Sequence, residues 1–248
     1  MFMLKLKFAC LLPLLCASLL HAATLAETLA ASAPDANPKA IAQALQASRC
    51  ATLTLGAKPA ERLALIDYSR PSVERRLWIF DLEAKTLLFS EYVAHGRGSG
   101  DNWAHAFSNR ESSLQSSLGL FVTAESYTGV HGRSLRLDGL EPGINDQART
   151  RAIVLHGADY VDPKLGMTQG RIGRSHGCPA VRPEITDQVI DALQGGQMLY
   201  AYYAQRQEQP ARGRNTFVRG ARQKNGAERV DQGIAESALQ RCELPAPR

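Results

Sequence analysis

A chain of 248 residues, 44% of them hydrophobic, is long enough to bury one substantial core and leaves little room for a second domain. It contains 29 Lys or Arg against 24 Asp or Glu, a net charge of +5. Residues 205–248 alone have a charge of +4, so the body of the chain lacks the basic surface that nucleic-acid binding needs, and we expect no nucleic-acid partner.

Residues 1–23 have the pattern of a secretory signal peptide. Lys5 and Lys7 precede an apolar run from Phe8 to Leu20, and small residues follow at the expected cleavage site. A membrane anchor needs about 20 apolar residues, and this run is shorter, so we expect cleavage, with uncleaved tethering as the alternative. The prediction is secretion across the inner membrane, into the periplasm or the cell wall.

Between the signal and the tail, the hydrophobic pattern predicts two regions. Residues 24–60 form a helical lead-in, in which Pro38 suits the first turn of a single helix and the following apolar residues recur at helical spacing. Residues 61–204 form the main domain. Its apolar runs are short and in places consecutive, which is typical of strands covered on both faces. The strands are expected at 63–68, 75–82, 86–96, 117–127 and 197–203.

Residues 130–143 are expected to be a loop, because an Asp-Gly and a Pro-Gly turn signal follow one another closely. We expect His131 and Arg133 in this loop to line a cleft; an ordinary exposed loop is an equal alternative. The histidines and cysteines do not show the close paired spacing of zinc ligands, so no metal and no cofactor is predicted.

The most informative stretch combines a histidine and a cysteine. A buried apolar strand is predicted to end at His156, and Cys178 follows 22 residues later in a tight turn. In that turn Gly177 can adopt a positive φ and leave backbone amides pointing outward. Imidazolium and amide dipoles both stabilise a thiolate, so His156 and Cys178 are a candidate dyad. His176 is the rival base, because residues two apart in an extended segment share a face.

The segments after the turn complete the chain. Residues 183–193 predict a helix that packs beside the sheet and supports the turn containing Cys178. Residues 205–248 are polar and basic, with nine Lys or Arg against five Asp or Glu. We expect either attraction to anionic wall polymer or a membrane surface, or a solvated, partly disordered extension.

The histidine, the loop after it and the cysteine turn together resemble a known family. His156-Gly157, a loop, and then Ser175-His176-Gly177-Cys178 are similar to the signature of the YkuD-type L,D-transpeptidases of peptidoglycan. Residues 63–203 resemble the catalytic domain of that family. The resemblance implies a mainly β fold with short helices (α+β), a sandwich or open barrel with a supporting helix after the cysteine.

Two departures from the family pattern affect the expected substrate contacts. The loop between His156 and Ser175 has 18 residues, slightly more than usual, and Pro179 to Arg182 differ from the residues that usually follow the cysteine. We therefore expect Arg182 to contact substrate, although it does not match a position of the family pattern. The other expected substrate-binding residues are Ser175, Arg174, Arg171, His131 and Arg133.

The resemblance also implies a mechanism. His156 takes the proton of Cys178, and the thiolate attacks an amide carbonyl of a peptidoglycan stem peptide to form a thioester, which passes to an amine or to water. The Gly157 carbonyl would orient the His156 ring, and the amides of Gly177 and Cys178 would bind the oxyanion. The sequence does not identify the acceptor of the acyl group, so an L,D-carboxypeptidase or endopeptidase of the same fold is one alternative. A non-catalytic exported wall-binding module is the other.

Export also changes how the cysteines are interpreted. Loss of the signal removes two of the five and leaves Cys50, Cys178 and Cys242. In an oxidising compartment an odd count predicts one pair and one free thiol. The simplest assignment joins Cys50 to Cys242 and leaves Cys178 free to react; the alternative is that Cys50 and Cys242 are unpaired.

Overall fold

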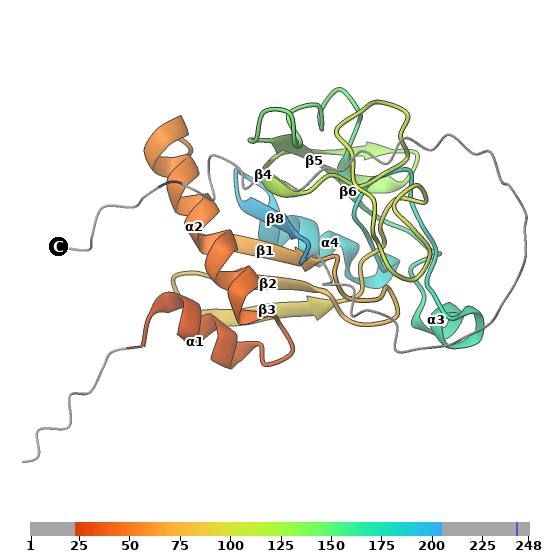
Figure 1. Ribbon diagram of the computed structural model, residues 1–248, viewed down its shortest axis with the longest axis horizontal. Helices are drawn as coiled ribbons and strands as arrows, with labels where there is room; N and C mark the ends of the chain where they lie inside the picture. Colours follow the sequence, from red (N-terminus) through yellow and green to blue (C-terminus); the bar gives the residue numbers. More distant parts are fainter. Residues whose placement is uncertain (1–22, 205–241, 243–248) are drawn as a thin grey trace, which may run out of the picture.

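A computed structural model describes residues 23–204 and residue 242, and Figure 1 shows how their helices and strands are arranged. The predicted signal peptide, apart from its last residue, and the predicted basic tail, apart from Cys242, lie outside the described residues. The strands are β1 Arg62–Asp67, β2 Leu77–Asp81, β3 Thr86–Glu91, β4 Gly119–Gly129, β5 Gly132–Gly139, β6 Val154–Gly157, β7 Ala180–Val181 and β8 Met198–Tyr202. The helices are α1 Leu25–Ser32, α2 Pro38–Leu55, α3 Pro163–Gln169 and α4 Pro183–Leu193.

One eight-stranded mixed sheet, in the order β3-β2-β1-β8-β4-β5-β6-β7, forms the body of the described chain. The sheet curls until its two edges meet: Ala94, just after β3, donates an N–H···O bond of 2.8 Å to Ala180 of β7. This contact nearly closes the sheet into a barrel, to which a few helices are added. The predicted class, a mainly β α+β fold with a helix after Cys178, is confirmed.

The central strands are buried on both faces, as their consecutive apolar residues predict. In β1, Leu63 and Leu65 share a core cluster with α1 and α2, whereas Ala64 and Ile66 belong to a second cluster that includes α4. This alternation follows from the two-residue period of side chains along a strand. A Leu or Ile buried this completely stabilises the fold by about 1.5–3 kcal/mol relative to its exposed state. The sheet is therefore fixed between two cores.

Two helices occupy the lead-in, where a single one was expected. Thr24 caps α1 through a reciprocal pair of bonds with Glu27, and Asn37 caps α2 by accepting a bond from the Lys39 N–H at 3.0 Å. Pro38 at the first position of α2 disfavours helical geometry in the residue before it, which separates the two helices. Both helices contribute to the core cluster that contains Leu63 and Leu65 of β1, so this segment packs against the sheet.

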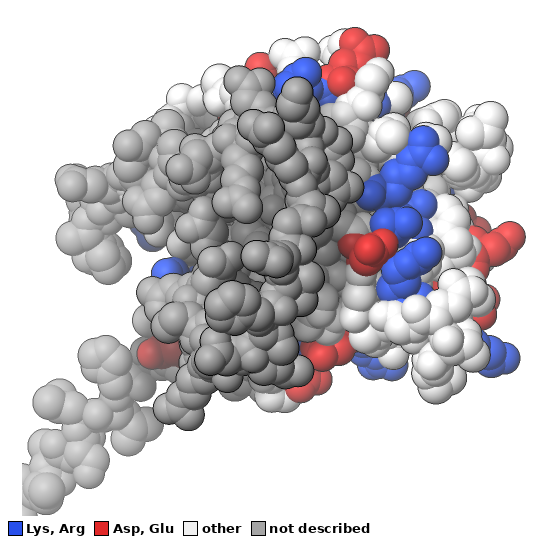
Figure 2. All heavy atoms as spheres, turned by 45° about the vertical axis from the view of Figure 1, so that its right-hand side comes forward, with Lys and Arg blue, Asp and Glu red and all other residues white. Residues whose placement is uncertain are grey.

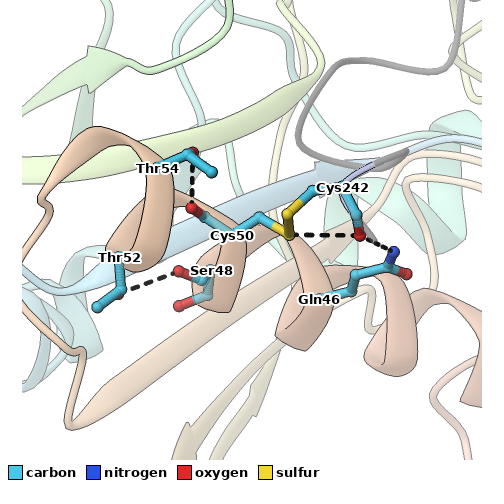
Figure 3. The surroundings of a disulfide bond; sticks show 6 residues. All are labelled: Gln46, Ser48, Cys50, Thr52, Thr54 and Cys242. Atoms are coloured by element: carbon cyan, nitrogen blue, oxygen red, sulfur yellow. Dashed lines mark hydrogen bonds between the residues drawn. A yellow bond between two sulfur atoms is a disulfide. The ribbon is translucent and has the colours of Figure 1, made fainter. Parts of the chain in front are cut away.

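A disulfide joins Cys50 of α2 to Cys242, with 6.1 Å between the two Cα atoms (Figure 3). Gln46, in the same helix, donates a hydrogen bond to the Cys242 carbonyl at 3.3 Å. Cys178 is free. This is the pairing expected from the cysteine count, and it attaches residue 242 to the outer face of the sheet through α2.

Besides the second helix of the lead-in, the sequence analysis did not predict β5, α3 or β7. Residues 130–143 contain β5, which forms a hairpin with β4, so the prediction of a loop for this segment was wrong. The alternation of buried Leu135 and Leu137 with half-buried Arg136 is a strand signal that the neighbouring turn residues obscured. Helix α3, which begins after an Asp162 cap, was also not predicted. Within residues 23–204, no helix is both long enough and apolar enough to span a membrane.

Candidate active site

Strands β6 and β7 bring the predicted base and nucleophile near each other. They are parallel neighbours, with His156 beside Ala180, and Cys178 lies two residues before Ala180. The Cys178 sulfur accepts a hydrogen bond from the Val154 N–H at 3.5 Å and donates one to the Ala152 carbonyl at 3.6 Å. Among the described residues, no hydrogen bond joins this sulfur to the His156 ring. The half-buried thiol is therefore fixed by backbone groups at the start of the strand that contains the histidine.

His156 is buried and fixed in one tautomer. Its Nδ1 lies 2.8 Å from the Gly157 carbonyl oxygen, which can only accept, so Nδ1 has the proton and Nε2 keeps its lone pair. Burial lowers the pKa of His156; the bond to Gly157 raises this pKa, and the neighbouring His131 lowers it further. The ring is therefore neutral at pH 7, which suits a general base.

His131 covers one face of the His156 ring. It lies in the β4–β5 hairpin and stacks on His156, with 4.3 Å between the ring centroids and 19° between the ring planes. It also borders a cleft of about 600 Å³, together with Arg133, Gly157 and Tyr160. His131 and Arg133 thus border a cleft, whose lining residues include neither Cys178 nor His156; their contact with substrate stays a prediction. In the described part of the chain, no three His, Cys, Asp or Glu residues are grouped in a way that suits a metal ion.

A network of hydrogen bonds shapes the turn that contains Cys178. Ser175 is buried; its Oγ donates to the Cys178 carbonyl at 2.6 Å and accepts from the Gly177 N–H at 3.0 Å. Gly177 has a φ of 131°, which favours glycine, and its carbonyl accepts a bond from the Ser116 hydroxyl at 3.0 Å. Ser175 therefore stabilises the turn from inside, whereas the sequence analysis predicted that it contacts substrate.

Two other residues of the turn also differ from their predicted geometry. The Gly177 N–H, expected to bind an oxyanion, is already bonded to Ser175. His176 is exposed at a bend, so the extended geometry that would put its ring on the same face as Cys178 is absent. The Cys178 N–H interacts with its own sulfur and lowers the pKa of the thiol. Of the two amides, only that of Cys178 has no hydrogen bond to another described residue, so it remains the candidate oxyanion donor.

Comparison with known families shows to which family this chain belongs. Residues 32–202, more than half of the chain, match the sequence model of the L,D-transpeptidase catalytic domain. The chain belongs to the L,D-transpeptidase catalytic domain family. No curated protein matches it by sequence.

Solved structures of the same family are similar to this chain at low sequence identity. An L,D-transpeptidase from Mycobacterium smegmatis shares 14% identity, with a TM-score of 0.35, over 58% of this chain and 59% of that one. An L,D-transpeptidase from Stackebrandtia nassauensis shares 13% identity, with a TM-score of 0.34, over 72% of this chain and 88% of that one. The match thus covers 59% of the length of the Mycobacterium smegmatis protein.

The arginines predicted to contact substrate are each paired with an acidic side chain. Figure 2, which brings the α3 side of Figure 1 forward, shows basic side chains gathered on this face with acidic ones beside them. The pairs are Arg182–Glu91 at 2.8 Å, Arg174–Asp101 at 2.8 Å, Arg171–Asp101 at 3.9 Å and Arg133–Asp191 at 2.6 Å. Glu91 is buried, and Arg182 binds both of its carboxylate oxygens. A substrate carboxylate would have to compete with these partners, so the four arginines are not preformed carboxylate sites.

Sequence reasoning missed Arg151, five residues before His156. Its half-buried guanidinium donates four hydrogen bonds to neutral oxygens. Burial raises the pKa of the Cys178 thiol, while the Val154 N–H and then the Arg151 charge lower it. No local pattern separates Arg151 from the basic residues around it; its one sequence signal is a place just before the strand that leads to the histidine.

Proposed function

We propose that this protein is an L,D-transpeptidase, a cysteine acyltransferase that acts on peptidoglycan stem peptides, with Cys178 as nucleophile and His156 as base. The observation that supports this most is the arrangement of β6 and β7, in which a free thiol lies near a histidine whose Nε2 is unprotonated. Membership of the L,D-transpeptidase catalytic domain family supports the same reaction.

The pKa shifts of the pair favour an uncharged resting state. Burial raises the pKa of Cys178 and lowers that of His156, so at pH 7 the pair rests as thiol and imidazole. The reaction then begins when the sulfur leaves the Ala152 carbonyl and passes its proton to Nε2 of His156. Catalytic hydrogen bonds are often long without substrate and shorten when it binds.

In the acylation step, the sulfur of Cys178 bonds to an amide carbonyl carbon of the stem peptide. The C–N bond breaks, and the leaving amine takes the proton from His156, which leaves a thioester. An acceptor amine then attacks the thioester carbon and gives a proton to His156. The released thiolate takes that proton back. The Cys178 N–H is the proposed oxyanion donor, and the Gly177 N–H joins it only by releasing Ser175.

We also propose that the protein acts outside the cytoplasm, in the periplasm or cell wall. The signal pattern of residues 1–23 supports this location. The disulfide between Cys50 and Cys242 supports it too, because disulfides persist in oxidising compartments. Cell fractionation with an antibody to the protein tests the proposal, and recovery of the uncleaved chain in the cytoplasmic fraction would contradict it.

The product test uses the mature protein, beginning at residue 24, and muropeptides with tetrapeptide stems. Transpeptidation predicts crosslinked dimers in the mass spectrum, and a carboxypeptidase predicts shortened stems alone. Cys178→Ala should give neither product. A wall-binding module would sediment with wall sacculi and leave every muropeptide unchanged. That last result, with a folded wild-type protein, would overturn the proposal.

A further inference from the structure

A guanidinium lies beside the turn that contains the nucleophile. Arg151 precedes β6, and its Nη2 would be 3.4 Å from a methyl group placed on Gly177, the residue before Cys178. The Arg151 side chain is half-buried. Its charge is therefore screened less by water and salt than the charge of a surface arginine.

The hydrogen-bond partners of Arg151 leave its positive charge uncompensated. Nη1 donates to the Ser108 carbonyl and the Ser117 hydroxyl, at 2.5 and 2.6 Å. Nη2 donates to the Gln115 carbonyl and the Ser113 hydroxyl, at 2.6 and 3.2 Å. All four acceptors are neutral, and no acidic residue of the described ranges 23–204 and 242 forms an ion pair with this arginine.

The neighbouring Arg149 shows the opposite situation. It is exposed, and its guanidinium pairs with Glu125 at 2.9 Å and with Asp138 at 2.5 Å. Two carboxylates compensate its charge and fix it on the outside of β4 and β5. Two arginines of one segment therefore differ in whether their charge remains available to the reaction centre.

We propose that Arg151 is a positioning residue for the reaction, whose guanidinium charge stabilises the Cys178 thiolate. The inference depends on the proposed function in one respect, the identity of Cys178 as the nucleophile. At rest His156 is neutral and contributes no positive charge, whereas the Arg151 charge acts on the thiol through space. The thiolate formed by proton transfer would therefore have a fixed cation beside it.

The same contacts also suit a purely structural role. Arg151 binds residues 113–117, and within that segment the Ser116 hydroxyl bonds to the Gly177 carbonyl. A structural clamp depends on the number of hydrogen bonds, whereas stabilisation of a thiolate depends on charge. Variants that change one property and keep the other distinguish the two roles.

The first test measures how fast iodoacetamide alkylates Cys178 as a function of pH, in the mature protein with its disulfide intact. Arg151→Gln should move the midpoint of this profile to higher pH and slow alkylation at pH 7 about tenfold, because one nearby opposite charge is lost. Arg149→Gln is the matched control and should change neither quantity. An unchanged midpoint in folded Arg151→Gln would overturn the proposal.

The second test neutralises the charge without removing the arginine. Ser113→Asp places a carboxylate against Nη2 and should move the midpoint to higher pH, whereas Ser113→Asn, which is similar in size and neutral, should not. Equal midpoints in these two variants would support only the clamp and would overturn the proposal. This comparison decides the matter even if Arg151→Gln does not fold.

Alkylation requires no peptidoglycan, so these results are independent of the enzymatic test. A shifted midpoint in a protein that makes no muropeptide product would refute the proposed function and keep the assignment of Arg151. Normal product formation with an unshifted midpoint would support the proposed function and refute the assignment of Arg151.

Discussion

The proposed base and the proposed nucleophile are positioned by different kinds of structure. His156 lies in a regular strand, fixed by pairing with β5 and β7 and by the carbonyl of the next residue. Cys178 lies in an irregular turn, whose shape depends on the hydroxyls of Ser175 and Ser116 and on the backbone of Gly177. Strand pairing uses backbone groups and tolerates many side-chain changes. The position of the nucleophile should therefore be more sensitive to single substitutions than that of the base.

Removal of the base side chain itself should have the largest effect. His156→Ala should lower the rate of acylation by about 10²–10⁴-fold, because proton transfer from the thiol loses its acceptor. His176→Ala should keep the rate within a few-fold, since that ring is exposed at a bend. Single-turnover acylation with tetrapeptide muropeptides measures both rates. A larger loss in His176→Ala would identify His176, in the turn, as the base in place of His156.

A methyl group at the turn should be the next most damaging change. In Gly177→Ala the new carbon would lie 2.9 Å from the Gln115 carbonyl, at a φ of 131°. We expect a displaced sulfur and an acylation rate lower by about 100-fold, with a stability cost of about 1–3 kcal/mol. Gly143→Ala is the control, because Gly143 also has a positive φ, of 77°, with nothing within 4 Å of the added carbon. If the two variants lose equal activity, close packing of the turn is not what positions the sulfur.

Two buried serines allow a direct comparison of the turn that contains Cys178 with the strands around His156. Ser175→Ala removes two hydrogen bonds from the turn and should destabilise the protein by about 1–3 kcal/mol, with slower acylation. Ser134→Ala, in β5 opposite His156, removes one bond to the Gly132 carbonyl and should leave acylation nearly unchanged. Thermal unfolding and single-turnover rates measure these effects. Greater loss of activity in Ser134→Ala would reverse the proposed contrast between strand and turn.

The smallest expected effect is a change in pH dependence. His131→Ala would expose the His156 ring to water and remove a neighbouring titratable group, and both changes raise the pKa of His156 toward its ordinary value. A general base loses activity as pH falls through its pKa, so the acid limb of the kcat/KM profile should move to higher pH. A limb that stays in place would mean that His131 does not influence the base.

Strand β6, which contains His156, and the central strands β1 and β2 could be predicted from the sequence, whereas β5 and β7, which pair with β6, could not. The consecutive apolar residues of β1 and β2 and the apolar run into His156 have patterns that depend on local packing alone. Strand β5 was missed because the Asp138-Gly139 and Pro142-Gly143 turn signals at and after its C-terminal end outweighed its short alternating pattern. Local propensity and tertiary pairing disagreed there, and pairing with β4 and β6 decided the outcome.

The roles of the arginines could not be predicted, because a guanidinium has the same sequence signature whether or not it is paired. Arg182 and Glu91 are 91 positions apart, and Arg174 and Asp101 are 73 apart. Only the closed sheet brings each pair together. The same holds for Arg151, whose neutral partners come from residues 108–117. The sequence thus predicted Cys178 and His156 as the reactive pair, but it did not predict which charged groups the fold places around them.

Intact-protein mass spectrometry after rapid acid quenching tests the central claim most directly. The mature protein, mixed with a tetrapeptide stem donor, should gain the mass of the donor acyl group after loss of its terminal residue, and peptide mapping should locate that mass on Cys178. The adduct should be absent from Cys178→Ala and should form far more slowly in His156→Ala. An acyl group on any other residue, or product formation by Cys178→Ala, would contradict the account.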